Sequence, residues 1–89
     1  MNVYEQDNVT IIKCETNIMG DQSIKLQNHL KMAVSKGKKL FLFQMSAVEN
    51  MDTIGICALI ALKKQLGTNG RIEFQDARES VAALLTIIG

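Results

Sequence analysis

Leu40-Phe41-Leu42-Phe43 is an unbroken run of large apolar residues with no polar residue among them. A strand with one wet face alternates between apolar and polar residues, whereas an uninterrupted apolar run is typical of a strand buried on both faces. We therefore expect residues 40–43 to form the central strand of a sheet, around which the other segments are arranged.

Further strands are predicted on both sides of this run in the sequence. Residues 3–6 and 9–14 are rich in apolar and β-branched residues, and Asp7-Asn8 lies between them. Asn and Asp tolerate tight-turn geometry, so this stretch predicts a β-hairpin. Downstream, residues 71–75 alternate strictly between polar and apolar, which predicts a strand with one solvent-exposed face.

A first helix is predicted between the hairpin and the central strand. Asp21 or Ser23 can cap its start, and Gly37 supplies a stop. Its apolar residues recur at helical spacing on one side, at Leu26, Leu30, Ala33 and Val34. This pattern predicts an amphipathic helix lying on a flat surface such as a sheet.

Two more helices are predicted after the central strand. One runs from about Thr53 to Leu66, before a turn at residues 67–70. The other begins near Asp76, with Glu79 three positions later as in a capping box. Its apolar side consists of Val81, Leu84, Leu85 and Ile88.

The resulting order of elements is ββαβαβα. Strands that alternate with helices favour parallel pairing through right-handed crossovers, so we expect a small α/β sandwich with a mixed, mostly parallel four-stranded sheet. With 89 residues, of which 47% are hydrophobic, the chain is long enough for one core and one domain, residues 1–89.

Composition excludes several classes of function. The formal charge of +1 provides no strong field for nucleic acid or an anionic membrane. The sequence carries no signal-peptide pattern or apolar stretch of membrane-spanning length, so we expect a cytoplasmic protein without membrane insertion. Cys14 and Cys57 are expected to be reduced core thiols. His29 is the only histidine, and no catalytic, metal-binding or phosphate-loop motif occurs; we expect no enzyme activity, metal or cofactor.

The predicted helix at Thr53 has apolar residues on all sides of its first turns. This set includes Ile54, Ile56 and Leu59, and the first charged residue of the helix is Lys63. One side can pack against the sheet, so the other predicts an exposed protein-binding patch unless another helix covers it.

Thr53 lies where a helix N-terminus carries partial positive charge and free N–H donors. A phosphate would be tolerated there, and it would add about −1.5 to −2 charges beside the apolar patch. Phosphorylation of Thr53 would therefore weaken the binding of a docked partner without unfolding the domain. The alternative is that Asp52 or Thr53 serves only as a helix cap.

The stretch Met45-Ser-Ala-Val-Glu-Asn-Met-Asp-Thr-Ile-Gly55 resembles the STAS domain family of anti-sigma-factor antagonists and their relatives, whose motif runs like D-x-S-x-V-x-x-M-D-S-S-G. The spacing matches without a gap, and Asn69-Gly-Arg-Ile matches the family's G-G-R-L. The resemblance implies a STAS-like fold in which Thr53 is the phospho-acceptor of a cognate anti-sigma-factor serine/threonine kinase. Ile54 replaces the second motif serine, and Gln44 replaces the leading acidic residue.

Our leading hypothesis is a non-enzymatic binding module, an anti-sigma-factor antagonist in a kinase partner switch. Asp52 is expected to orient Thr53, and Gly55 to keep the helix start open to the partner. The expected partner-binding residues are Ser46, Asn50, Met51, Asp52, Ile54, Gly55, Ile56 and Leu59. The alternative is a STAS subunit that docks constitutively on a transporter ATPase or a larger signalling assembly. A homodimer is compatible with either hypothesis, and a small-ligand or nucleotide-binding module is less well supported.

Overall fold

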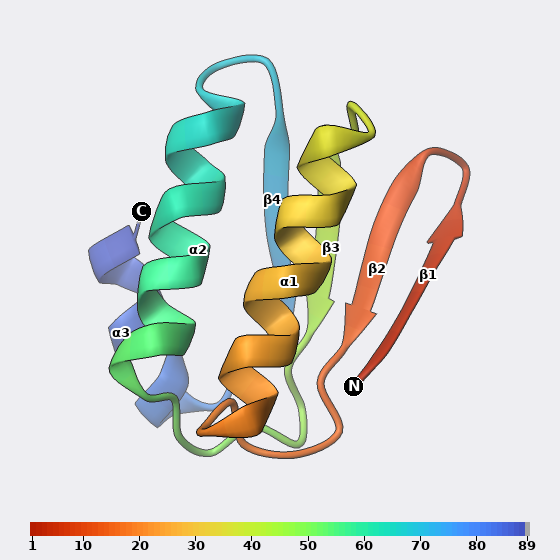
Figure 1. The fold of residues 1–89 in the computed structure, drawn as a ribbon. Coiled ribbons are helices and arrows are strands. Elements are labelled where there is room, and N and C mark those ends of the chain that lie inside the picture. The colour runs from red at the N-terminus through yellow and green to blue at the C-terminus, as the bar shows by residue number, and fades with distance from the viewer. Residues whose placement is uncertain (89) are drawn as a thin grey trace.

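The computed structural model describes residues 1–88, which form four strands and three helices in the predicted order ββαβαβα (Figure 1). The elements are β1 (Asn2–Gln6), β2 (Val9–Lys13), α1 (Asp21–Ser35), β3 (Leu40–Gln44), α2 (Thr53–Leu66), β4 (Arg71–Gln75) and α3 (Glu79–Ile88). Within this range, each helix is too short or too polar to cross a membrane.

The strands form one mixed sheet in the order β1-β2-β3-β4. β1 and β2 are antiparallel and joined by Asp7 and Asn8, whose φ angles of 53° and 68° are those of a two-residue hairpin turn. β2, β3 and β4 are mutually parallel. Both the hairpin and the mostly parallel sheet are therefore confirmed.

The direction of the chain through the sheet places α1 and α2 on the same face. The crossovers from β2 to β3 and from β3 to β4 both advance in the same direction across the sheet. Right-handed crossovers that advance in one direction put their helices on one side. Figure 1 shows α1 and α2 side by side in front of the sheet, and α3 beside its β4 edge.

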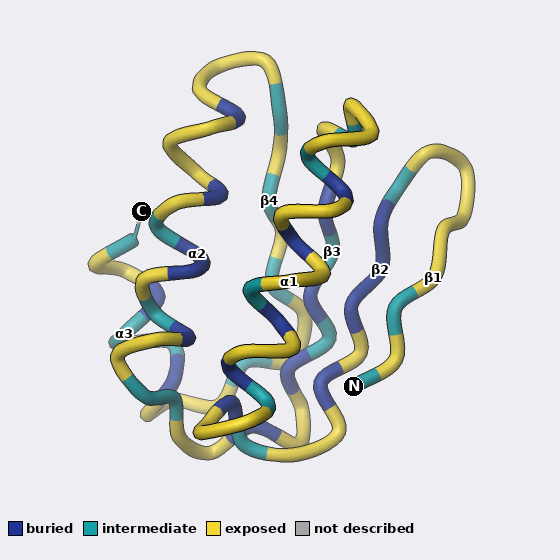
Figure 2. The backbone as a smooth tube through the Cα atoms, in the orientation of Figure 1, coloured by how far each residue is buried: buried dark blue, intermediate teal, exposed yellow. Residues whose placement is uncertain are grey.

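The core fills the space between this face and the helices. It combines Ile12, Phe41 and Phe43 of the sheet with residues such as Leu26 of α1 and Leu59 of α2, all at most 2% exposed (Figure 2). The Phe43 and Phe74 rings stack with centroids 5.3 Å apart, joining β3 to β4. The predicted apolar side of α1 is confirmed, since Leu26, Leu30 and Ala33 are buried.

The expectation that residues 40–43 are buried on both faces is wrong. Phe41 and Phe43 point into the core, but Leu40 on the opposite face is 39% exposed and Leu42 is only half-buried. The reason is that both crossover helices cover the same face. The other face, which we call the open face, is not covered by any helix among residues 1–88.

Two predicted helix caps are also wrong. α1 has Gly20 at its N-cap with no side-chain cap of its own, because Ser23 is buried and bonds elsewhere, and Asp21 makes no cap. α3 begins at Glu79, so Glu79 is its first residue and cannot occupy the third helical position that a capping box with Asp76 requires.

Burial on one face predicts unequal costs for neighbouring substitutions in β3. Phe43→Ala should lower the free energy of unfolding by about 3–5 kcal/mol, because it leaves a cavity in the core. Leu42→Ala should cost less, about 1–2 kcal/mol, because this side chain is only partly buried. Urea denaturation of both variants at low protein concentration measures the difference. Equal large losses would contradict a sheet that is covered on one face.

Candidate partner-binding surface

Two loops meet at the edge where β2 and β3 end, which is the lower edge in Figure 1. Residues 14–20 connect β2 to α1, and residues 45–52 connect β3 to α2. A short parallel bridge joins them: the Ile18 amide donates to the Asn50 carbonyl at 3.1 Å, and the Asp52 amide donates to the Ile18 carbonyl at 3.0 Å. The bridge brings the start of α1 next to the start of α2.

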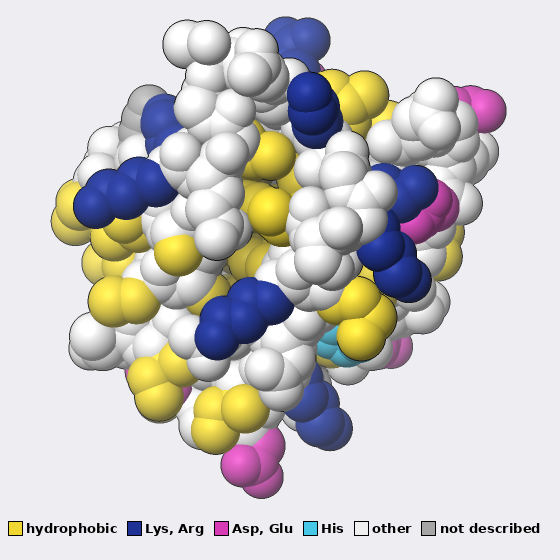
Figure 3. Space-filling model, turned by 45° about the horizontal axis from the view of Figure 1, so that its top comes forward, with side chains coloured by type: hydrophobic (Ala, Val, Ile, Leu, Met, Phe, Trp, Pro, Cys, Tyr) yellow, Lys and Arg dark blue, Asp and Glu magenta, His cyan; other side chains and the backbone are white. Residues whose placement is uncertain are grey.

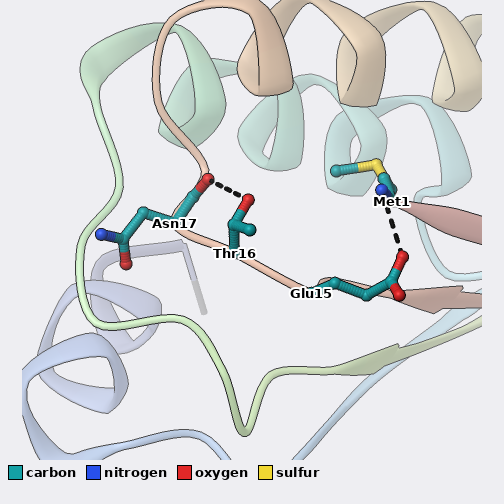
Figure 4. A network of polar contacts seen from close by, with 4 residues as sticks. All are labelled: Met1, Glu15, Thr16 and Asn17. Atoms are coloured by element: carbon teal, nitrogen blue, oxygen red, sulfur yellow. Dashed lines mark hydrogen bonds and ion pairs between the residues drawn. The ribbon is translucent and has the colours of Figure 1, made fainter.

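Asn17 reinforces this junction. Its side-chain oxygen accepts hydrogen bonds from the backbone amides of Glu49 at 2.7 Å and Asn50 at 3.0 Å. Figure 4 shows the Asn17 side chain directed toward the loop that follows β3, while its own carbonyl accepts from the Thr16 hydroxyl at 3.3 Å. On the same loop, Glu15 lies 3.4 Å from the amino group of Met1. The loop of residues 14–20 is thus bonded both to the loop that follows β3 and to the N-terminus of the chain.

The Asp52 carboxylate connects the N-termini of the two helices. One oxygen, Oδ1, accepts from the Gly55 amide of α2 at 2.9 Å and from the Ser23 hydroxyl of α1 at 2.6 Å. The other, Oδ2, accepts from the Gly20 amide at 2.8 Å. Asp52 is therefore the N-cap of α2 and also supplies the hydrogen bond that α1 lacks from its own side chains.

These hydrogen bonds favour the ionised form of Asp52. The bond from the Ser23 hydroxyl, followed by those from the Gly55 and Gly20 amides, lowers the pKa of the Asp52 carboxyl from its usual value of 3.8. The expectation that Asp52 orients Thr53 is corrected, because these hydrogen bonds direct the carboxylate toward α1 and toward the amide of Gly55.

The expectation that Gly55 keeps the helix start open to a partner is corrected, because Gly55 is buried. A Cβ atom at this position would lie 2.7 Å from the Ile18 Cγ2 atom and 3.3 Å from the Ser23 hydroxyl. The glycine therefore allows α2 to approach the loop before α1 closely enough for Asp52 to reach Ser23. Its role is in packing rather than in partner contact.

Thr53 is the first residue of α2 and is exposed. Beside it, Ile54 is exposed by 44%. Two further exposed apolar residues flank the segment that contacts Asp52: Met19 is 49% exposed and Ile24 is 46% exposed. Figure 3 shows hydrophobic side chains exposed along α2 and around the lower ends of the helices.

Met19 and Ile24 are additions to the site expected from the sequence. Ile24 is an apolar residue outside the apolar side formed by Leu26, Leu30 and Ala33. That departure from the helical pattern was the available signal. Met19 lies in a loop, where no periodic pattern exists to reveal an unpaired apolar residue.

The other expected site residues divide by burial. Ser46 and Asn50 are exposed, and Met51, Asp52 and Ile56 are partly buried. Leu59 is 0% exposed, so its expected contact with a partner is wrong: it lies on the side of α2 that packs on the sheet. The exposed apolar patch on α2 therefore includes Ile54 but not Leu59.

The two thiols lie in different environments. Cys14 is buried, and burial raises the pKa of its thiol to about 11, so it is an inert core group. Cys57 is exposed one turn after Thr53, contrary to the expectation of a core thiol. No group of His, Cys, Asp and Glu within residues 1–88 has the geometry of a metal site.

Comparison with known proteins places this geometry in a known fold. The model of the STAS domain family matches residues 1–89. A solved structure described as the anti-sigma factor antagonist SpoIIAA in its unphosphorylated form aligns with a TM-score of 0.81 at 10% identity, covering 97% of this chain and 81% of that one. A crystal structure of a protein named Mglu aligns with a TM-score of 0.68 at 14% identity, covering 88% of this chain and 20% of that one.

The Asp52 hydrogen bonds predict a pH dependence of stability. Because the pKa of Asp52 is lower in the folded state than in the unfolded state, its contribution is fully present above the usual pKa of 3.8 and is lost as the pH falls through the lower folded value. Urea denaturation between neutral and strongly acidic pH should show this loss in the wild type. In Asp52→Asn, which keeps a capping side chain without a titrating group, this part of the pH dependence should be absent. Identical pH profiles for the two proteins would refute the assignment.

Proposed function

The chain belongs to the STAS domain family, and we therefore propose that it is a non-enzymatic binding module, an anti-sigma-factor antagonist in a kinase partner switch. Unmodified protein binds an anti-sigma-factor serine/threonine kinase, and phosphorylation of Thr53 releases it. The observation that carries the proposal is the exposure of Thr53 at the first residue of α2, next to the exposed Ile54.

The position of Thr53 suits a phosphate without requiring the fold to change. Thr53 lies at the positive end of the dipole of α2, which favours an anion even though the Gly55 amide already donates to Asp52. The added charge of about −1.5 to −2 would then stand among exposed apolar side chains and repel or desolvate a docked partner. Binding is lost while the domain stays folded.

Asp52 does not act as a base in this reaction. Its carboxylate already accepts from Gly20, Ser23 and Gly55. The proton of the Thr53 hydroxyl is therefore removed by a group of the kinase, and Asp52 contributes by fixing the start of α2.

The proposed contact surface consists of the exposed residues around Thr53. It comprises Met19, Ile24, Ser46, Asn50 and Ile54, with the partly buried Met51, Asp52 and Ile56 at its base. The apolar members supply the area that a partner desolvates, and the polar loop residues surround them. Gly55 and Leu59 support this surface from beneath without touching the partner.

Constitutive docking is the second candidate. The exposed Met19, Ile24 and Ile54 would bind a transporter ATPase or a larger signalling assembly by the same contacts without any modification. The two candidates share the surface and differ only in whether Thr53 is phosphorylated.

Modification of Thr53 distinguishes these candidates. Incubation with soluble kinases of the host and ATP, followed by mass spectrometry, should place a phosphate on Thr53. In pull-down experiments Thr53→Ala should keep its partner, and Thr53→Glu should lose binding by about tenfold or more, because a charge is placed in the contact surface.

Thr68→Glu provides a matched control, because Thr68 is exposed in the turn after α2, at the opposite end of that helix. It should bind as the wild type does. Absence of phosphate together with full binding by Thr53→Glu would reject the switch and leave constitutive docking.

A further inference from the structure

The open face carries an apolar centre surrounded by polar groups. The strand register sets three rows across it: Gln6, Val9, Leu40 and Arg71; Tyr4, Ile11, Leu42 and Glu73; Asn2, Lys13, Gln44 and Gln75. Ile11 is only 7% exposed yet does not belong to the core cluster between sheet and helices. Its burial comes from its neighbours on the open face, so this face has an apolar cluster of its own.

The face also has a projection and a hollow. Tyr4 on the edge strand β1 is 40% exposed. Two strands away, a hollow of about 280 Å³ is lined by Val9, Leu40, Phe41, Leu42, Arg71 and Glu73. An aromatic ring at one edge and a hollow toward the other are what a self-complementary surface requires, because each copy offers both.

We propose that the open face binds a second copy of this chain, forming a two-fold symmetric dimer with the two sheets packed face to face. A two-fold axis parallel to the strands, between β2 and β3, places β1 of each copy over β4 of the other. Tyr4 then lies over the Glu73 position beside the hollow, and Ile11 lies over Leu42.

The charges on the face fit this arrangement. Arg71 and Glu73 form an ion pair within one chain, with Nε and Oε1 3.1 Å apart, so they present little net charge to the second copy. The same symmetry places Lys13 opposite Gln44 and Arg71 opposite Gln6. No like charges meet, which removes the usual obstacle to packing two identical surfaces.

The size of the face predicts a weak dimer. Four strands of five residues, about 4.8 Å apart and rising about 3.3 Å per residue, cover an area roughly 15–20 Å on each side. Two such faces bury roughly 450–800 Å² in total, which is below the range of stable interfaces and is typical of weak, transient contacts. Dissociation in the micromolar to millimolar range is therefore expected. Thr53 lies outside the face, so the dimer does not depend on the proposed switch.

Sedimentation velocity over a range of concentrations tests the dimer. The wild type should shift from monomer to dimer. Leu42→Lys should raise the dissociation constant at least about tenfold by placing an unpaired charge opposite Ile11, and Tyr4→Glu should do so by placing a like charge opposite Glu73. Met32→Lys is the matched control, because Met32 is 59% exposed on α1, and it should dimerise as the wild type does.

Two further measurements show whether the variants are folded and whether the dimer uses the open face. Tyr4 lies on an exposed edge strand, so Tyr4→Glu should keep the circular dichroism spectrum of the wild type even if Leu42→Lys does not. Amide NMR signals that move on dilution should belong to residues such as Tyr4, Ile11 and Leu42. A monomer at every concentration, or a dimer that folded Tyr4→Glu leaves unchanged, would overturn the proposal and leave the face to a different partner.

Discussion

The Asp52 carboxylate is the contact on which the geometry of the candidate site depends. Two helices begin at the same edge of the sheet, and each leaves backbone N–H groups without intrahelical partners. One side chain serves both helices, through Gly55 on α2 and through Gly20 and Ser23 at the start of α1. Because the small Gly55 lets the backbones approach, this cap also fixes the distance between the helices.

Thr53 gains its position from this arrangement. A residue that follows an anchored N-cap is held in place by the backbone while its own side chain stays available at the surface. The carboxylate that could have oriented the hydroxyl is engaged inside the fold instead. The structural and the proposed functional roles are thus assigned to adjacent residues, Asp52 and Thr53.

Much of the fold could be predicted from the sequence because local patterns determine it. The hairpin follows from Asp7-Asn8, the apolar side of α1 from its spacing, and the exposed face of β4 from alternation. The covering of β3 could not be predicted that way. Whether an apolar run is buried on one face or two depends on which side the crossover helices take, and that is set by strand order across the whole sheet.

The candidate site was predictable in part for the same reason. The motif locates Thr53 and its loop. The partners of Asp52 at the start of α1, Gly20 and Ser23, lie 32 and 29 positions away in the chain, where no spacing rule reaches. The burial of Gly55 could not be predicted, because a helix that is hydrophobic on all sides does not reveal which side faces the sheet. The expected exposure of Leu59 is wrong for the same reason.

The open face also results from the strand order, because that order determines which side of the sheet the crossover helices cover. A chain that places both crossover helices on one side leaves the apolar side chains of the other side without a covering helix. The edge with Thr53 and the open face are separate surfaces, so the two proposed contacts do not compete for the same part of the domain.

A pair of double-mutant cycles on the free energy of unfolding tests the role of Asp52 most directly. One cycle combines Asp52→Ala with Ser23→Ala, and the other combines Asp52→Ala with Thr53→Ala. A stabilising interaction energy in the first cycle and additivity in the second are predicted, because the carboxylate bonds Ser23 and leaves the Thr53 hydroxyl to the surface. Additivity with Ser23 together with coupling to Thr53 would contradict the account.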